Sequence, residues 1–167
     1  KFLTEYEHIT FIEALSKLAQ HANLEMPSST KKNDKSYNLF ISNKASADYF
    51  ARNLNNNTKA MKYLEERAIN MEMIKEFHLG YSLDSWDSLR NELQKNKLVN
   101  NAIDAGLLIK TDKKIYDRFR NRVMFPIKNS SGNIIGFGGR SFENNKEAKY
   151  INSPETKLFH KSYELYG

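Results

Sequence analysis

A change of hydrophobic periodicity at Gly106 is the feature that most constrains how this chain of 167 residues can fold. Before Gly106, apolar residues recur at the spacing of amphipathic helices in several short segments. After it, apolar and polar residues alternate, as is typical of strands, in residues 107–110, 117–128 and 133–140. A helical half followed by a sheet half predicts an α+β fold, in which short helices precede a small antiparallel or mixed sheet.

Start and stop signals divide the helical half into short segments. The expected helices begin or centre, in chain order, at Thr10, residue 44, Thr58, Asn70, Ser85 and Ala102. Gly80 and Gly106 are expected to close two of them, and Trp86 is expected on the apolar face of the fifth. Because helices this short do not persist alone in water, they must pack together.

A polar segment separates the first helix from the rest. Residues 27–38, PSSTKKNDKSYN, are poor in apolar side chains, as flexible linkers are. We therefore expect residues 1–26 to be the tail of a preceding domain, residues 27–43 a linker, and residues 44–167 the main domain.

The positive charge of the chain is concentrated in its last third. The chain carries 26 Lys and Arg against 20 Asp and Glu, a net charge of +6. The basic and acidic residues are equal in number up to residue 106, so the whole excess lies in residues 107–167. A localised positive field favours polyanions such as nucleic acid, nucleotides or acidic lipid. A lysine-rich solvated surface without a partner is the alternative.

The two longest predicted strands form a β-hairpin. Its turn is expected to be closed by Asn129 and Asn133, with Gly132 in the left-handed conformation. In that register Phe125 lies opposite Phe137, which gathers the apolar side chains on one face.

The other face of the hairpin is then basic and glycine-rich. It comprises Arg118, Arg120, Arg122, Lys128, Gly136, Gly138 and Arg140. Arg122 would lie directly opposite Arg140, and two like charges in that position favour an anion between them. Glycines beside arginines also leave room for a phosphate backbone. The alternative is that the arginines form ion pairs with Asp112, Asp117 or Glu143.

The segment KYINSPET (149–156) follows the hairpin. Lys149 offers a mobile cation, Tyr150 a ring that can stack on a base, and Asn152 and Ser153 polar groups suited to sugar or phosphate. The alternative is a simple turn at Ser153, with Tyr150 and Ile151 packed inward.

Signals for catalysis, metal binding and membranes are weak in this sequence. The chain has no cysteine, its four histidines lack metal-ligand spacing, and no phosphate-binding glycine loop or close set of carboxylates occurs. No segment has the length of a membrane span, and residues 1–15 do not read as a secretory signal. We therefore expect no catalytic residue and no metal site here, in a cytoplasmic protein.

Seven motifs, taken in order, resemble the bacterial DnaG-type DNA primase family. They are YLEERAI (63–69), FHLGYS (77–82), AGLL (105–108), DRFRNRVMFPI (117–127), GNIIGFGGR (132–140), KYINSPET (149–156) and LFHKSYELYG (158–167). The resemblance covers at least residues 44–167, and residues 1–27 resemble the end of that family's zinc-binding domain. Ala68 departs from the family, which usually has glycine after the arginine of YLEER.

The resemblance implies a function in replication. The family synthesises short RNA primers on single-stranded DNA, with a polymerase core whose TOPRIM subdomain holds magnesium. This chain would be the subdomain before TOPRIM, inactive alone, and zinc and magnesium would belong to the full-length protein. Implied partners are single-stranded DNA template, RNA–DNA hybrid and nucleoside triphosphates, with the replicative helicase bound by regions outside this chain. A monomer without membrane contact is expected.

The basic groove of this subdomain is implied to guide template and hybrid. The basic contacts that the resemblance implies are Arg67, Arg118, Arg120, Arg122, Arg140, Lys149 and Lys161. Together with Tyr150, Asn152 and Ser153, which the local chemistry of residues 149–156 suggests, they are the expected nucleic-acid or nucleotide contacts. Two other readings stay open from the residues alone: a non-catalytic single-stranded nucleic-acid-binding module, and an interaction domain that docks an acidic protein.

Overall fold

The computed structural model of the chain describes residues 4, 6, 11–22, 35–143 and 148–161. Its helices are α2 (Phe11–His21), α4 (Lys35–Asn55), α5 (Thr58–Glu65), α6 (Met71–Glu76), α7 (Ser88–Lys95) and α8 (Val99–Asp104). Its strands are β1 (Gly80–Ser82), β2 (Leu108–Lys110), β3 (Ile115–Asp117), β4 (Arg122–Lys128), β5 (Ile134–Arg140) and β6 (Tyr150–Asn152). The predicted α+β class is confirmed.

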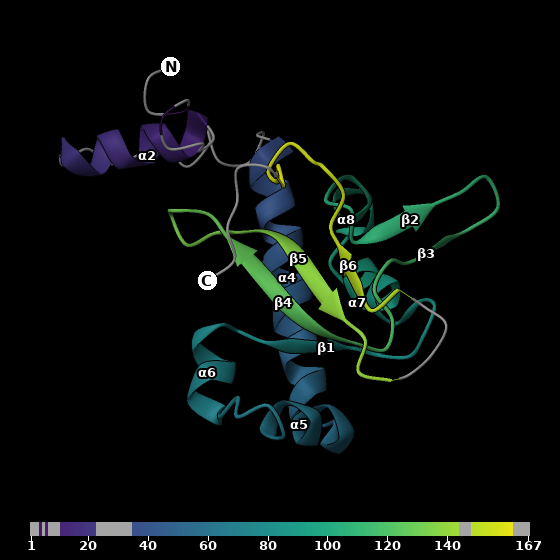
Figure 1. Ribbon diagram of the computed structural model, residues 1–167. Helices are drawn as coiled ribbons and strands as arrows, with labels where there is room; N and C mark the ends of the chain where they lie inside the picture. The colour runs from purple at the N-terminus through teal and green to yellow at the C-terminus, as the bar shows by residue number, and fades with distance from the viewer. Residues whose placement is uncertain (1–3, 5, 7–10, 23–34, 144–147, 162–167) are drawn as a thin grey trace.

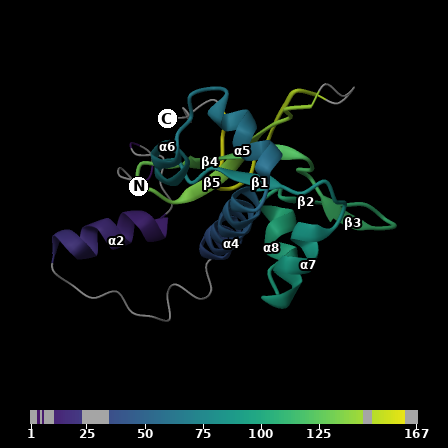
Figure 2. The ribbon, with the colours of Figure 1, turned by 90° about the horizontal axis from the view of Figure 1, so that it is seen from below.

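The strands form a four-stranded antiparallel sheet and a separate hairpin. The sheet has the order β1-β4-β5-β6, and β2 pairs with β3 alone. Helix α4 runs along one face of the sheet, and α7, α8 and the β2–β3 hairpin lie beside α4 (Figures 1 and 2). On that face Phe50 of α4 meets Phe137 of β5 edge-on, with ring centroids 5.6 Å apart.

Two hydrophobic clusters hold these layers together. The larger joins α4, α7 and α8 to β4 and β5, around Phe50, Met124 and Phe137. The smaller joins α5, α6 and β1 to Val123 of β4. Burial in these clusters supplies the packing that the short helices need.

Helix α4 begins before the expected position. We expected a linker to residue 43, but residues 35–43 belong to α4. Leu39 is buried in the larger cluster, and Asn43 is buried with its Nδ2 donating to the carbonyl oxygen of Ile134 at 3.0 Å. Polar residues of this part of α4, such as Asn43, are therefore buried against the rest of the protein. Polar composition alone could not distinguish such a helix from an exposed linker.

The helix boundaries are partly as expected. Asn70 caps α6 by accepting from the N–H of Met73 at 2.9 Å, whereas α5 is capped by Asn57 and not by Thr58. Gly80 does not close α6: His78 takes the left-handed conformation (φ 53°), and Gly80 begins β1, a strand that we did not predict.

Residues 117–128 form two strands and not one. Strand β3 ends at Asp117, and the chain turns through Asn121, which has φ 49°, before β4 begins at Arg122. The Asp117 carboxylate faces α7, where it accepts from the backbone N–H groups of Leu89 at 2.8 Å and Arg90 at 3.0 Å. It caps that helix, and burial raises its pKa.

The predicted hairpin register is correct at the turn and wrong in the strands. Asn129 and Asn133 close the turn and Gly132 has φ 79°, as expected. Between Ile127 and Lys128 the register then shifts by one residue, at an irregularity that leaves Ile135 as the extra residue. Phe125 therefore pairs with Gly138, and not with Phe137.

This shift separates the two arginines that we expected to face each other. Arg140 pairs with Val123 of β4, so its side chain shares the face of Phe125. Arg122 lies on the opposite face with Met124, which is covered by α4. The proposed row of arginines on one face does not exist.

Candidate nucleic-acid interface

A hollow of about 410 Å³ opens on the face of the sheet that carries Phe125 and Ile127. We call it the open groove. Its polar lining consists of Arg140, Asn152 and Lys161, and its apolar lining includes Tyr150 and Phe159. The glycines of β5 make its floor, because Gly138 has no side chain to fill the space between Phe125 and Asn152.

Pairing of β5 with β6 assembles the centre of the open groove. Arg140 lies opposite Tyr150, and Gly138 lies opposite Asn152. The Arg140 guanidinium stands 5.2 Å from the Tyr150 ring centroid and 5.7 Å from that of Tyr63. Tyr150 is 59% exposed, so one side of its ring is open to a ligand. We did not predict β6, but Arg140, Tyr150 and Asn152 were all among the expected contacts.

Arg67 joins this cluster through Tyr63. Its guanidinium lies 3.8 Å from the Tyr63 ring centroid, and Nη1 donates to the Tyr63 carbonyl oxygen at 3.3 Å. Tyr63 is buried and lies under both Arg67 and Arg140. The two arginines are therefore held by one ring.

Ala68, after Arg67, has a left-handed backbone with φ 57°. A side chain in that conformation is strained, whereas glycine adopts it freely. This explains why glycine suits this position, where the chain departs from the family pattern. Replacing Ala68 with glycine is expected to raise the free energy of unfolding by about 1 kcal/mol.

Urea unfolding followed by circular dichroism measures that difference. The matched control is Ala45→Gly within α4, which is expected to lower the stability by about 1 kcal/mol because glycine weakens a helix interior. Equal losses in both variants would contradict the strain at Ala68.

Two expected contacts are buried and support β6 from behind. Arg122 is 3% exposed, and its Nη1 donates to the carbonyl oxygens of Ala148 at 2.8 Å and Lys149 at 3.3 Å. Ser153 is fully buried, and its Oγ accepts from the N–H of Phe137 at 3.0 Å. Both side chains fix the strand that carries Tyr150. Lys149 and Lys161, by contrast, are exposed.

A second surface surrounds Trp86, which is 57% exposed. The Arg120 guanidinium lies 4.0 Å from the Trp86 ring centroid, and Lys114 Nζ lies 5.0 Å from it. The Tyr116 ring meets Trp86 edge-on at 5.4 Å. We call these four residues the Trp86 surface. Sequence reasoning found only Arg120, and the aromatic residues next to a basic segment were the signal that it missed.

Backbone carbonyls hold the arginines beside this surface. Arg120 Nη1 donates to the carbonyl oxygen of Asp117, and Arg118 Nε donates to that of Gly106, both at 2.6 Å. Arg118 is half-buried, and burial lowers its pKa from the usual arginine value, which leaves it charged.

The two surfaces offer the same chemistry. Each combines guanidinium or ammonium groups, which bind phosphate, with an exposed aromatic ring on which a base can stack. In the part of the chain that the structure describes, no three His, Asp or Glu side chains are grouped to hold a metal. No helix in those same ranges is long and apolar enough to cross a membrane.

Comparison with known proteins identifies the family. The chain belongs to the family of the DNA primase catalytic core, N-terminal domain, which matches residues 49–167. The DNA primase of Clostridium acetobutylicum is 40% identical over 172 residues, which cover 99% of this chain and 29% of that relative. The chain thus spans less than a third of the length of such relatives.

Solved structures of primases share this fold. A DnaG primase catalytic domain bound to single-stranded DNA superposes with a TM-score of 0.74 at 39% identity, covering 80% of this chain and 42% of that one. The Aquifex aeolicus primase, with its zinc-binding and RNA polymerase domains, gives a TM-score of 0.75 at 31% identity. That match covers 99% of this chain and 40% of the Aquifex chain.

Proposed function

We propose that this chain is the template-handling part of a bacterial replicative DNA primase, an enzyme that makes short RNA primers on single-stranded DNA. The observation that carries the proposal is the placement of Arg140 between two tyrosine rings in the open groove. Its Nε has no hydrogen-bond partner among the described residues. Arg140 also lines the open groove and forms no ion pair with a described residue, so its uncompensated positive charge there favours an anionic ligand.

In this proposal the residues of the open groove divide the ligand between them. Arg140 and Lys161 bind phosphates of template, hybrid or nucleoside triphosphate, Tyr150 stacks on a base, and Asn152 contacts sugar or base. Lys149 does not line the groove, and it binds a phosphate outside it. The other expected contacts lie outside the groove. Arg67 orients Tyr63, and Arg122 and Ser153 position β6. Arg118 and Arg120 provide positive charge near the Trp86 surface.

The chemistry of nucleotide addition would take place outside this chain. The residues present do not fit zinc or magnesium, because the chain has no cysteine and its described carboxylates are not grouped. We therefore place both metals, and the contact with the helicase, in other parts of a cytoplasmic protein, and expect this chain alone to be inactive and monomeric. The Aquifex match supports residues 1–26 as the tail of a zinc-binding domain.

The two alternatives have less support. A stand-alone single-stranded nucleic-acid-binding module is not favoured by membership in a catalytic-core family. An acidic protein partner is supported by the positive charge alone, whereas membership in the primase family supports a nucleic-acid partner, on whose bases the exposed rings of Tyr150 and Trp86 can stack.

Trp86 is the only tryptophan of the chain, so its fluorescence reports directly on the Trp86 surface. We expect an oligothymidylate to quench this fluorescence as it binds, and added salt to reverse the quenching, because bound phosphates release counterions. A polyglutamate of equal charge is the control, and it should leave the emission unchanged.

Anisotropy of a labelled oligonucleotide measures binding in the same titration. Binding without quenching would remove Trp86 from the template path. Equal binding of oligothymidylate and polyglutamate would favour the acidic protein partner over the primase proposal.

A further inference from the structure

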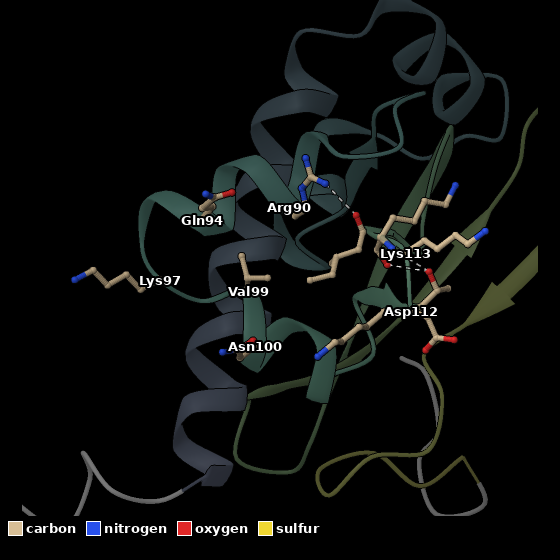
Figure 3. A pocket seen from close by; sticks show the side chains of 11 residues that line it. Arg90, Gln94, Lys97, Val99, Asn100, Asp112 and Lys113 are labelled. Atoms are coloured by element: carbon tan, nitrogen blue, oxygen red, sulfur yellow. Dashed lines mark hydrogen bonds between the residues drawn. The ribbon is translucent and has the colours of Figure 1, made fainter.

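A basic hollow of about 740 Å³ lies between the β2–β3 hairpin and helices α7 and α8 (Figure 3). We propose that this hairpin hollow binds further phosphates of the same single strand, beyond the Trp86 surface. This inference rests on the proposed function and extends the template path to a site that the primase proposal does not require.

The charge of the hairpin hollow is strongly positive. Arg90, Lys110, Lys113 and Lys114 line it, and Asp112 is the only carboxylate in its lining among the described residues. Lys97 also belongs to the lining, but Figure 3 shows its side chain extending away from the hairpin.

Two of these cations are available to a ligand. Arg90 is committed to the protein, because its Nη1 donates to the carbonyl oxygen of Ile115 at 3.1 Å and its Nη2 to Asp87 at 3.0 Å. Lys110 and Lys113 are exposed, and neither forms an ion pair with any residue that the structure describes.

Hydrogen bonds close the hairpin turn that follows Lys110 and contains Lys113. The Thr111 N–H donates to the Lys114 carbonyl oxygen at 2.9 Å, and the Lys114 N–H donates to Thr111 Oγ1 at 3.2 Å. A closed turn presents its side chains with less loss of entropy on binding than an open loop does.

Lys114 connects the hairpin hollow to the Trp86 surface. Its Nζ lies 5.0 Å from the Trp86 ring centroid and 5.1 Å from that of Tyr116, and the same side chain lines the hollow. A strand whose base stacks on Trp86 therefore has the next cations within the hairpin hollow. This continuity is why we choose a nucleic-acid backbone over a separate acidic protein.

The test compares oligothymidylates of about 5 and about 15 nucleotides, a range that brackets typical single-strand site sizes. Lys110→Ala/Lys113→Ala is compared with Lys59→Ala/Lys75→Ala, which removes the same charge from α5 and α6. Affinity is measured by fluorescence anisotropy across a salt series, with circular dichroism to confirm folding.

We expect the hairpin variant to lose about tenfold in affinity for the long oligomer and to bind the short one like wild type. Its salt slope with the long oligomer should be shallower by about 1.4, which corresponds to two single-strand phosphate contacts. The α5–α6 variant should match wild type with both lengths.

Other outcomes overturn the inference in distinguishable ways. If Trp86 is quenched but both double variants bind the long oligomer alike, the hairpin hollow is not on the path and the proposed function stands. An equal loss with both lengths would place the lysines within the Trp86 site. If wild type binds neither oligomer, the proposed function fails as well.

Discussion

Replacing Gly80 with alanine is expected to destabilise the chain by about 3 kcal/mol, the upper part of the range for overpacked sites. Gly80 begins β1, where this strand crosses α4. An added Cβ would lie against the Cβ of Phe50, 2.7 Å from its carbonyl carbon and 3.0 Å from the backbone nitrogen of Ala51. Because two of these atoms belong to the α4 backbone, no rotation of a side chain relieves the contact. Urea unfolding monitored by circular dichroism measures the loss.

Gly138→Ala is the matched control for this prediction. It makes the same change in another strand of the sheet, where the new Cβ would have its nearest contact at 3.3 Å, with Asn152 Oδ1. We expect a stability change below about 1 kcal/mol there, together with weaker DNA binding because the methyl group enters the open groove. Equal stabilities for the two variants would show that β1 can move away from α4.

The elements that the sequence predicted correctly are those with strong local signals. The change of periodicity at Gly106 identified the class, and Asn70 and Gly132 occupy the cap and turn positions that their chemistry favours. Strands β1 and β6 were missed because each has three residues and no run of apolar residues, whereas the equally short β2 was predicted from the apolar residues 107–109. Strands that short carry no periodicity of their own and exist because a neighbouring strand pairs with them.

The error in the predicted β4–β5 register shows that alternation along a strand does not by itself determine strand pairing. Alternation assumes an uninterrupted ladder, and one extra residue at Ile135 moves every later side chain of β5 to the other face. Without the extra residue, Arg140 is expected to lie opposite Arg122. In the structure Arg140 lies opposite Val123 of β4 and Tyr150 of β6. Gly136, which follows the extra residue, is the available signal, because a glycine inside a strand often marks a bulge. It does not fix the position of the bulge, since β5 contains further glycines.

The sequence indicated several residues that the structure places in the candidate site, but it did not predict how these residues are arranged on the surface. The family resemblance pointed to Arg140 and the local chemistry of residues 149–156 pointed to Tyr150 and Asn152, and the structure brings these three residues together in one groove. Trp86 was expected within a helix, but the Asp117 carboxylate begins α7 after it, so the ring remains exposed. A cap supplied from a residue so distant in the chain cannot be read from a local pattern.

Replacing Arg140 with alanine is expected to weaken binding of single-stranded DNA by at least about tenfold at low salt, the equivalent of one charge-assisted contact. The guanidinium is positioned by Tyr63 and Tyr150, so its loss removes both the cation and the packing between the two rings. The salt slope should become shallower by about 0.7. Fluorescence anisotropy across a salt series measures both quantities.

Arg52→Ala supplies the control, because it removes the same charge from α4, where Arg52 pairs with Glu92 at 2.7 Å and lines neither the open groove nor the hairpin hollow. We expect it to bind DNA like wild type. If the two variants lose affinity alike, general charge and not the open groove attracts the strand. If a folded Arg140→Ala variant keeps the affinity and salt slope of wild type, the template does not contact this groove, and the Trp86 surface alone would remain as its path.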